Sequence, residues 1–254
     1  MDGSAFVSWY EDDKFWVDFY PAMYHEGRWE VAVEEVKQIS GLLQLAPGDR
    51  VLDVCCGPGR HAICLARAGF EMMGVDHTAT YLDIGRQRAE DERLEVDFIL
   101  DDVRQFRREA GFDAALCMYT SLGYFDDPDE DRVLLENICH SLKPGGRLIV
   151  DLSGKEVLAH LFRAENRTVL ADGSTFLEER SIVGDWERVN NRWVLDREDG
   201  RVERRFSVRI YSGEDLKGMM LAAGFETVDL YGTLDGTPYD HSARRLVAVG
   251  LRRP

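Results

Sequence analysis

The sequence predicts a doubly wound α/β fold: a seven-stranded, mostly parallel sheet with an inserted antiparallel β meander. Three observations carry this prediction. A strand pattern, a glycine-rich turn and a helical pattern follow one another between Arg50 and Gly69. Strand and helix patterns then alternate as far as Leu152. Between Ser174 and Ile210 the pattern changes to alternating polar and apolar residues with turn pairs between them.

The stretch RVLDVCCGPGR, residues 50–60, is the centre of the predicted fold. Its apolar run Val51 to Val54 is typical of a buried parallel strand. Gly57 and Gly59 allow a tight turn, and a Cβ at these positions would hold a ligand away from the backbone amides. A strand, a glycine loop and a helix N-terminus in this order form the usual binding place of a nucleotide-like cofactor.

Asp53 indicates which cofactor. Its carboxylate lies where the pyrophosphate of a dinucleotide would come close, and it would repel that anion but suit a cationic ligand. The order Asp-x-x-x-Gly-x-Gly, from Asp53 to Gly59, resembles motif I of the class I S-adenosylmethionine-dependent methyltransferases that act on small molecules. The stretch LKPGGRLIVDL, residues 142–152, is also typical of this Rossmann-like family. The resemblance implies S-adenosyl-L-methionine, which carries a sulfonium and an ammonium, as the cofactor.

Acidic residues follow the next two predicted strands. Asp76 comes 17 residues after Gly59, where an acid can accept both ribose hydroxyls; capping of the next helix is the alternative. After the strand Val96 to Leu100, the resemblance implies that Asp102 accepts the adenine amino group and that Val103 offers its backbone amide. Asp101 is the alternative to Asp102, and an ordinary polar turn is the competing interpretation.

The resemblance implies further cofactor contacts from Cys55, His77 and Met118, each at or just beyond the end of a predicted strand. Tyr119 and Tyr124, which follow the strand 112–118, are expected to face the cofactor or the substrate. Anchoring of the loop is the competing interpretation for Tyr124.

Residues 1–30 are predicted to form a helical arm interrupted by Pro21. The arm either packs onto the core or closes as a lid, and in the resembling family aromatic side chains of such an arm line the substrate pocket. Tyr20 and Tyr24 are the candidates, because aromatic faces attract a sulfonium. The aromatic residues of the arm are Phe6, Trp9, Tyr10, Phe15, Trp16, Phe19, Tyr20, Tyr24 and Trp29.

Methyl transfer from a sulfonium depends mostly on orientation, because the methyl group is already activated. An amine substrate has only to arrive unprotonated, whereas a hydroxyl substrate benefits from a base. Tyr119 and His241 are the candidate catalytic residues. No set of histidines and carboxylates has metal-ligand spacing, and the five cysteines contain no C-x-x-C pair, so we expect no metal.

Three regions are predicted: the arm (1–30), a cofactor-binding core (31–163 and 211–254) and an inserted β platform (164–210). Three strands are expected in the platform, with turns at Asn190-Asn191 and Asp199-Gly200. Its apolar face must cover something, so it either roofs the active site or pairs with a second copy of the chain. After the platform, a helix from Ser212 and an antiparallel strand pair are expected to complete the main sheet.

The net charge of −16 argues against a nucleic-acid partner and favours a neutral or cationic small molecule. The N-terminus lacks a signal-peptide pattern and no apolar run reaches membrane-spanning length, so we expect a cytoplasmic protein. The predicted function is methyl transfer to an N or O atom of a small molecule. One alternative is an NAD-dependent oxidoreductase, which Asp53 and the lack of a Tyr-x-x-x-Lys pair oppose. The other is a cofactor-binding protein without catalysis.

Overall fold

The central sheet has seven strands in the order β10-β11-β5-β4-β1-β2-β3, which confirms the predicted fold class. The computed structural model describes residues 8–254, so Phe6 of the predicted arm lies outside the described residues. The strands of this sheet are β1 (Arg50–Val54), β2 (Glu71–Asp76), β3 (Val96–Leu100), β4 (Phe112–Cys117), β5 (Leu142–Leu152), β10 (Phe225–Tyr231) and β11 (Leu246–Arg252). The first five are parallel, and β11 runs antiparallel to both β5 and β10, as the strand pair expected near the C-terminus requires.

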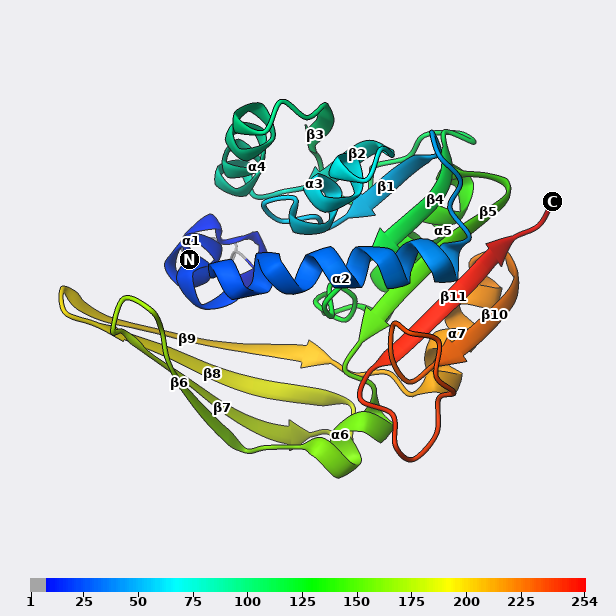
Figure 1. The fold of residues 1–254 in the computed structure, drawn as a ribbon. Coiled ribbons are helices and arrows are strands. Elements are labelled where there is room, and N and C mark those ends of the chain that lie inside the picture. Colours follow the sequence, from blue (N-terminus) through cyan, green and yellow to red (C-terminus); the bar gives the residue numbers. More distant parts are fainter. Residues whose placement is uncertain (1–7) are drawn as a thin grey trace, which may run out of the picture.

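Helices cover both faces of this sheet (Figure 1). They are α2 (Glu26–Leu43), α3 (Arg60–Arg67), α4 (Ala79–Asp91), α5 (Pro128–Ser141) and α7 (Gly213–Ala222). Helix α6 (Lys155–Leu161) lies elsewhere, and its Leu158 packs with Val189 and Ile210. Apolar residues of α2 and α3 pack with one face of β1, β4 and β5, and those of α5 and α7 pack with the other face. Because the central strands are buried on both faces, the segment Val51 to Val54 is apolar throughout except for Asp53.

The N-terminal arm consists of a short 3₁₀ turn η1 (Trp9–Glu11) and helix α1 (Asp13–Met23), and it leads directly into α2. The prediction that Pro21 interrupts the helix is wrong, because Pro21 lies inside α1. Its ring removes one backbone hydrogen bond, and the helix ends two residues later at Met23. Phe15 and Phe19 of α1 are buried against apolar residues of the second sheet, so the arm connects the two sheets.

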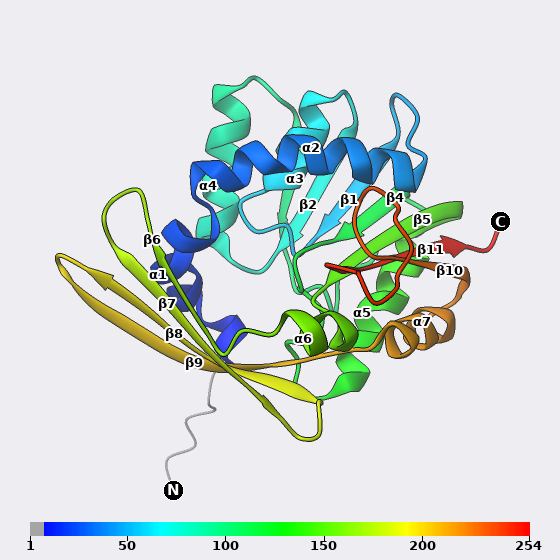
Figure 2. The ribbon, with the colours of Figure 1, turned by 60° about the horizontal axis from the view of Figure 1, so that its bottom comes forward.

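The second sheet is antiparallel, with strands β6 (Glu165–Val169), β7 (Thr175–Val183), β8 (Arg188–Arg197) and β9 (Gly200–Arg209) in that order. It has four strands and not the three predicted. The missed strand, β6, is mostly exposed and lacks an apolar alternation that would have revealed it. Figure 2 shows this curved sheet standing apart from the central one, with α1 beside it.

The turns of the second sheet correct one expectation and confirm another. Asn190 and Asn191 do not form a turn; they lie inside β8 and pair with β9. The turn between β7 and β8 is made by residues 184–186, whose φ angles are +61°, +53° and +67°. The turn at Asp199-Gly200 is confirmed, because β8 ends at Arg197 and β9 begins at Gly200.

Within residues 8–254 no helix combines the length and the apolar character that crossing a membrane requires.

Candidate functional site

A cavity of about 530 Å³ lies between the central sheet and the second sheet. Its floor is formed by residues at the carboxyl ends of β1 to β4, which is where open parallel sheets bind ligands. Its walls come from the N-terminal arm, through residues such as Trp9, Trp16 and Tyr24. Its roof is the inner face of the second sheet, including Asn166, Glu178 and Trp193.

Asp53 is buried in the floor with 2% of its surface exposed. Its Oδ2 atom has no hydrogen-bond partner among the described residues. Burial raises the pKa of this carboxyl to about 7, although a backbone hydrogen bond at Ala62 and the charge of Arg60 act in the opposite direction. A buried oxygen without a partner is costly, so this atom points to a ligand that donates a hydrogen bond.

The glycine loop is fixed from two sides. Gly57 has a φ of +56°, and its amide donates to Asp76 Oδ2 at 2.8 Å. Asp76 Oδ1 accepts from the Thr78 amide at 2.8 Å, so this carboxylate also holds the start of α4. A Cβ on Gly57 would lie 2.4 Å from the hydroxyl oxygen of Tyr24, which covers the loop from the arm. The structure therefore brings Tyr24, Gly57 and Asp76 together at the cavity.

Gly59 serves packing and does not line the cavity. Its φ is +75°, and a Cβ there would lie 2.5 Å from the ring of Phe98. Gly74 and Gly85 also lie against this ring, and a Cβ on them would come within 3.1 and 2.8 Å of it. Three glycines thus make room for one phenylalanine between β2, β3 and α4. The expectation that a Cβ on Gly59 would push a ligand away is corrected by this geometry.

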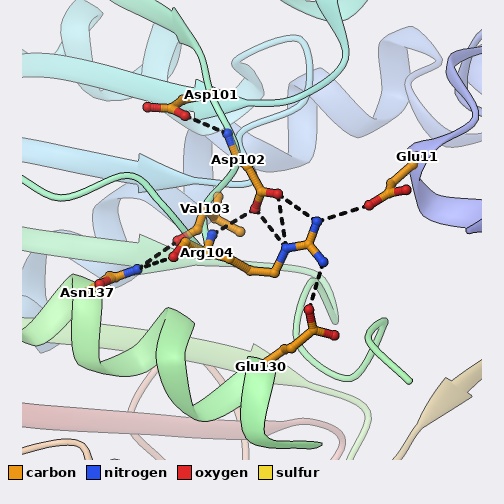
Figure 3. A network of polar contacts seen from close by, with 7 residues as sticks. All are labelled: Glu11, Asp101, Asp102, Val103, Arg104, Glu130 and Asn137. Carbon is orange, nitrogen blue, oxygen red and sulfur yellow. Dashed lines mark hydrogen bonds and ion pairs between the residues drawn. The ribbon is translucent and has the colours of Figure 1, made fainter. Parts of the chain in front are cut away.

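Asp102 and Asp101 both line the cavity, but their carboxylates have different partners (Figure 3). Arg104 donates to both carboxylate oxygens of Asp102. Burial alone would raise the pKa of that carboxyl, but these hydrogen bonds outweigh it and lower the pKa. The same guanidinium reaches Glu11 of the arm and Glu130 of α5, at 2.9 and 2.8 Å. Among the described residues, Asp101 Oδ1 accepts a hydrogen bond only from the Asp102 amide, at 2.8 Å. Asp101 is therefore the acid with more free acceptor capacity.

The other expected cofactor contacts also line the cavity: Cys55, His77, Val103 and Met118. Cys55 has a φ of +57°, and its thiol pKa is raised chiefly by a hydrogen bond with Cys117 and further by burial. A thiol held in this state is not a nucleophile.

Tyr119 lines the cavity, and its hydroxyl donates to Glu35 Oε1. Glu35 Oε2 accepts from His61 Nε2 at 3.0 Å. Burial alone would raise the Glu35 pKa, but the hydrogen bonds from His61 and Tyr119 outweigh it and hold the pKa at about 2. Burial lowers the pKa of His61, so the imidazole is neutral and donates to an ionised Glu35. The Tyr119 hydroxyl is thus committed to a buried network.

His241 does not line the cavity. Its side chain is exposed on the segment between β10 and β11. The segment folds back on itself through backbone hydrogen bonds of Gly232 with Thr237, Arg244 and Arg245. Tyr20 is likewise outside the lining, where its ring stacks on Tyr24 at 5.4 Å.

Sequence reasoning missed Glu35, Arg60 and the polar residues of the roof. Glu35 carried a signal, because it shares the inward face of α2 with Ala32 and Ile39, where a carboxylate is out of place. Asn166, Glu178 and Arg180 lie on adjacent strands, and Glu178 accepts hydrogen bonds from both neighbours, at 2.8 and 2.7 Å. The register that brings them together depends on the missed strand β6.

The apolar face of the second sheet lines the cavity of the same chain. Phe206 and Val208 of β9 line the cavity, as the predicted alternation with Arg205 and Ser207 allows. The opposite face carries charges, with Arg192 bonded to Glu203 at 2.8 Å.

Comparison with known proteins agrees with this geometry. Residues 51–146 match a family model described as "Methyltransferase domain". The chain is 32% identical over 124 residues to glycine N-methyltransferase of Mus musculus, which covers 44% of this chain and 42% of that protein. It is 30% identical over 116 residues to the ubiquinone biosynthesis O-methyltransferase of Coxiella burnetii (strain Dugway 5J108-111), covering 45% and 48%. The aligned region thus spans less than half the length of these curated relatives.

One solved structure shares the fold over nearly the whole chain. It is CalS10 with S-adenosylmethionine bound, an amino pentose methyltransferase from Micromonospora echinaspora, with a TM-score of 0.69 and 21% identity over 93% of this chain and 95% of that one. The strand order, the glycine loop and the match of residues 51–146 to a methyltransferase domain all agree with the resemblance to the class I S-adenosylmethionine-dependent methyltransferases. This match favours a methyltransferase over the NAD-dependent alternative.

Proposed function

We propose that the protein binds S-adenosylmethionine and transfers its methyl group to an amine nitrogen of a small, polyhydroxylated molecule such as an amino sugar. The observation that carries this proposal is the continuous cavity that extends from Asp53 and the glycine loop to the polar roof around Glu178. A ligand pocket that joins a cofactor cradle to a separate polar wall suits a two-substrate transfer reaction.

The residues at the floor fit the cofactor. Asp53 offers a buried oxygen without a partner to a cationic group. Gly57 leaves the loop open, and Asp76 keeps acceptor capacity beside it for ribose hydroxyls, because each oxygen accepts only one amide. Asp101 is our candidate for the adenine amino group, since Arg104 occupies Asp102.

The arrangement favours an amine over a hydroxyl acceptor. The bound cofactor supplies an activated methyl group, so the protein has mainly to orient the acceptor. A hydroxyl acceptor needs a base, but the Tyr119 hydroxyl donates to Glu35 and the His61 ring is buried beside the same carboxylate. These residues are hydrogen-bonded to one another, so none of them is free to act as a base. The acceptor therefore has to arrive as a neutral amine.

The roof favours a substrate with several hydroxyl groups. Glu178 is held by Asn166 and Arg180, so their remaining donors and acceptors are fixed in direction. Trp193 and Phe206 supply flat apolar surfaces next to them. Among proteins of this fold, CalS10 is an amino pentose methyltransferase, which supports the same substrate class.

The first test is calorimetric titration with S-adenosylmethionine and S-adenosylhomocysteine, followed by transfer of labelled methyl from the cofactor to a panel of amino sugars. Each amino sugar is paired with the counterpart in which a hydroxyl replaces the amine. We expect micromolar cofactor binding and label only in the amines. Label in the hydroxyl counterparts would overturn the choice of nitrogen, and binding without any transfer would favour a non-catalytic cofactor-binding protein.

Two variants test the roof. Glu178→Gln is expected to raise the KM for the amino sugar about 5- to 10-fold, because an ionised acceptor becomes neutral. Glu179→Gln is the matched control, since Glu179 is the next residue of β7 and bonds Arg192 on the opposite face. Equal KM values for the two variants would show that the roof does not contact the substrate.

A further inference from the structure

Arg60 is a buried arginine without a polar partner. It is the first residue of α3 and has 5% of its surface exposed. Within residues 8–254 its guanidinium takes part in no hydrogen bond or ion pair, and its buried Nε atom is without a partner. The side chain lines the cavity, with its guanidinium carbon 4.1 Å from the centre of the Tyr119 ring.

An arginine in this state is strongly destabilising unless a ligand completes its surroundings, because guanidinium groups are charged at all accessible pH values. The position of Arg60 is nevertheless well fixed. Tyr119 lies under it, and the hydroxyl of Tyr119 is tied to Glu35. Arg245 approaches the same ring at 4.5 Å, but that arginine is paired with Asp151. Arg60 is therefore a fixed cation that faces the cavity.

Asp53 faces the same cavity and also lacks a partner on one oxygen. The two groups are close enough for Arg60 to lower the Asp53 pKa, yet they form no ion pair with each other. Arg28 of α2 also lines the cavity and has no hydrogen-bond or ion-pair partner for its side chain among residues 8–254, but it is exposed, whereas Arg60 is buried as Asp53 is. A cavity that holds a buried unpaired cation and a buried unpaired acid is complementary to a zwitterion. Arg60 also lies at the N-terminus of α3, whose dipole adds to the attraction for an anion.

We propose that Arg60 binds the carboxylate of the cofactor's amino-acid end, while Asp53 receives the ammonium group of the same end. This inference rests on the proposed function, because it assigns residues to S-adenosylmethionine. It gives Arg60 a specificity role: the residue distinguishes cofactors that carry the carboxylate from adenosyl compounds that lack it. The planar fork of arginine suits this task, since it can bind a carboxylate through two parallel hydrogen bonds.

The test compares two ligands by calorimetry. One is S-adenosylhomocysteine, and the other is S-adenosyl-3-thiopropylamine, which lacks only the carboxylate. The wild-type protein is expected to prefer S-adenosylhomocysteine by at least about 10-fold, as befits a charge-assisted hydrogen bond. Arg60→Met should lose affinity for S-adenosylhomocysteine alone, so that the two ligands bind equally. Arg60→Lys should keep part of the preference.

Arg67→Met is the matched control, because it removes the same charge from the same helix at an exposed position paired with Glu92. It should keep the wild-type preference. A full preference in Arg60→Met, or no preference in the wild-type protein, would overturn the inference and leave the proposed function intact. Failure of the wild-type protein to bind either compound would overturn the proposed function and this assignment together. The wild-type comparison needs no variant, so a poorly folded Arg60→Met would not prevent a decision.

Discussion

Replacing Asp53 by asparagine should stabilise the ligand-free protein, and the gain should depend on pH. Burial raises the pKa of this carboxyl from 3.8 to about 7. Below pH 3.8 the group is protonated in both the folded and the unfolded state and costs nothing. Above pH 7 it is ionised in both states, and the folded state bears the cost of a buried charge. At about 1.36 kcal/mol per pKa unit, this cost reaches about 4 kcal/mol at pH 8.

Asparagine has nearly the same shape but does not ionise, so Asp53→Asn avoids the cost. The same relation gives a difference in unfolding free energy of about 2 kcal/mol at pH 5, rising to about 4 kcal/mol at pH 8. Urea denaturation of both proteins at the two pH values measures it. Asp83→Asn, which changes an exposed aspartate on α4, is the control and should show no such rise. The assignment of a raised pKa to Asp53 would be refuted by a stability difference that stays constant with pH. It would also be refuted if the wild-type protein were more stable than Asp53→Asn at pH 8.

Three further substitutions test the packing around the site. Gly57→Ala should weaken S-adenosylhomocysteine binding at least about 10-fold, because the new Cβ would lie 2.4 Å from the Tyr24 hydroxyl oxygen and the φ of +56° is strained for alanine. Calorimetry measures the affinity, and an affinity equal to that of the wild-type protein would show that Tyr24 moves freely. Gly59→Ala should lower the free energy of unfolding by about 1–3 kcal/mol through contact with Phe98. Adding Phe98→Leu should partly restore the melting temperature. No recovery of the melting temperature would mean that the φ of +75° alone causes the loss of stability. Glu35→Gln should cost about 3 kcal/mol of stability by leaving buried donors with a weaker acceptor, and a urea midpoint equal to that of the wild-type protein would show that the network contributes nothing.

The parts of the site that lie close together in sequence could be predicted, whereas those assembled by tertiary packing could not. Asp53 and Gly57 belong to one strand and its turn, so a local pattern was enough to find them. Glu35 meets His61 across 26 residues and Tyr119 across 84. No local pattern encodes contacts of that range, and one inward-facing carboxylate on α2 was the only trace of them.

The second sheet shows a different limit. The amide side chains of Asn190 and Asn191 are typical of turns, yet here they continue a long strand whose ends are fixed by β7 and β9. The real turn places Trp186 at a φ of +67°, a conformation that bulky residues rarely adopt. Pairing along the whole sheet outweighed these local preferences, just as the register with β7 turned the polar segment 165–169 into a strand.

The division of the cavity between two sheets has a consequence for how such proteins change over time. The roof is one uninterrupted stretch, Glu165–Arg209, and it shares no paired strand with the sheet that carries the glycine loop. Under the proposed function, substitutions there are expected to alter the choice of acceptor without disturbing the registers that place Asp53 and Asp76. The cofactor half can stay constant while the roof diversifies. A library confined to the inward-facing positions of this stretch is therefore the shortest route to variants with new acceptors.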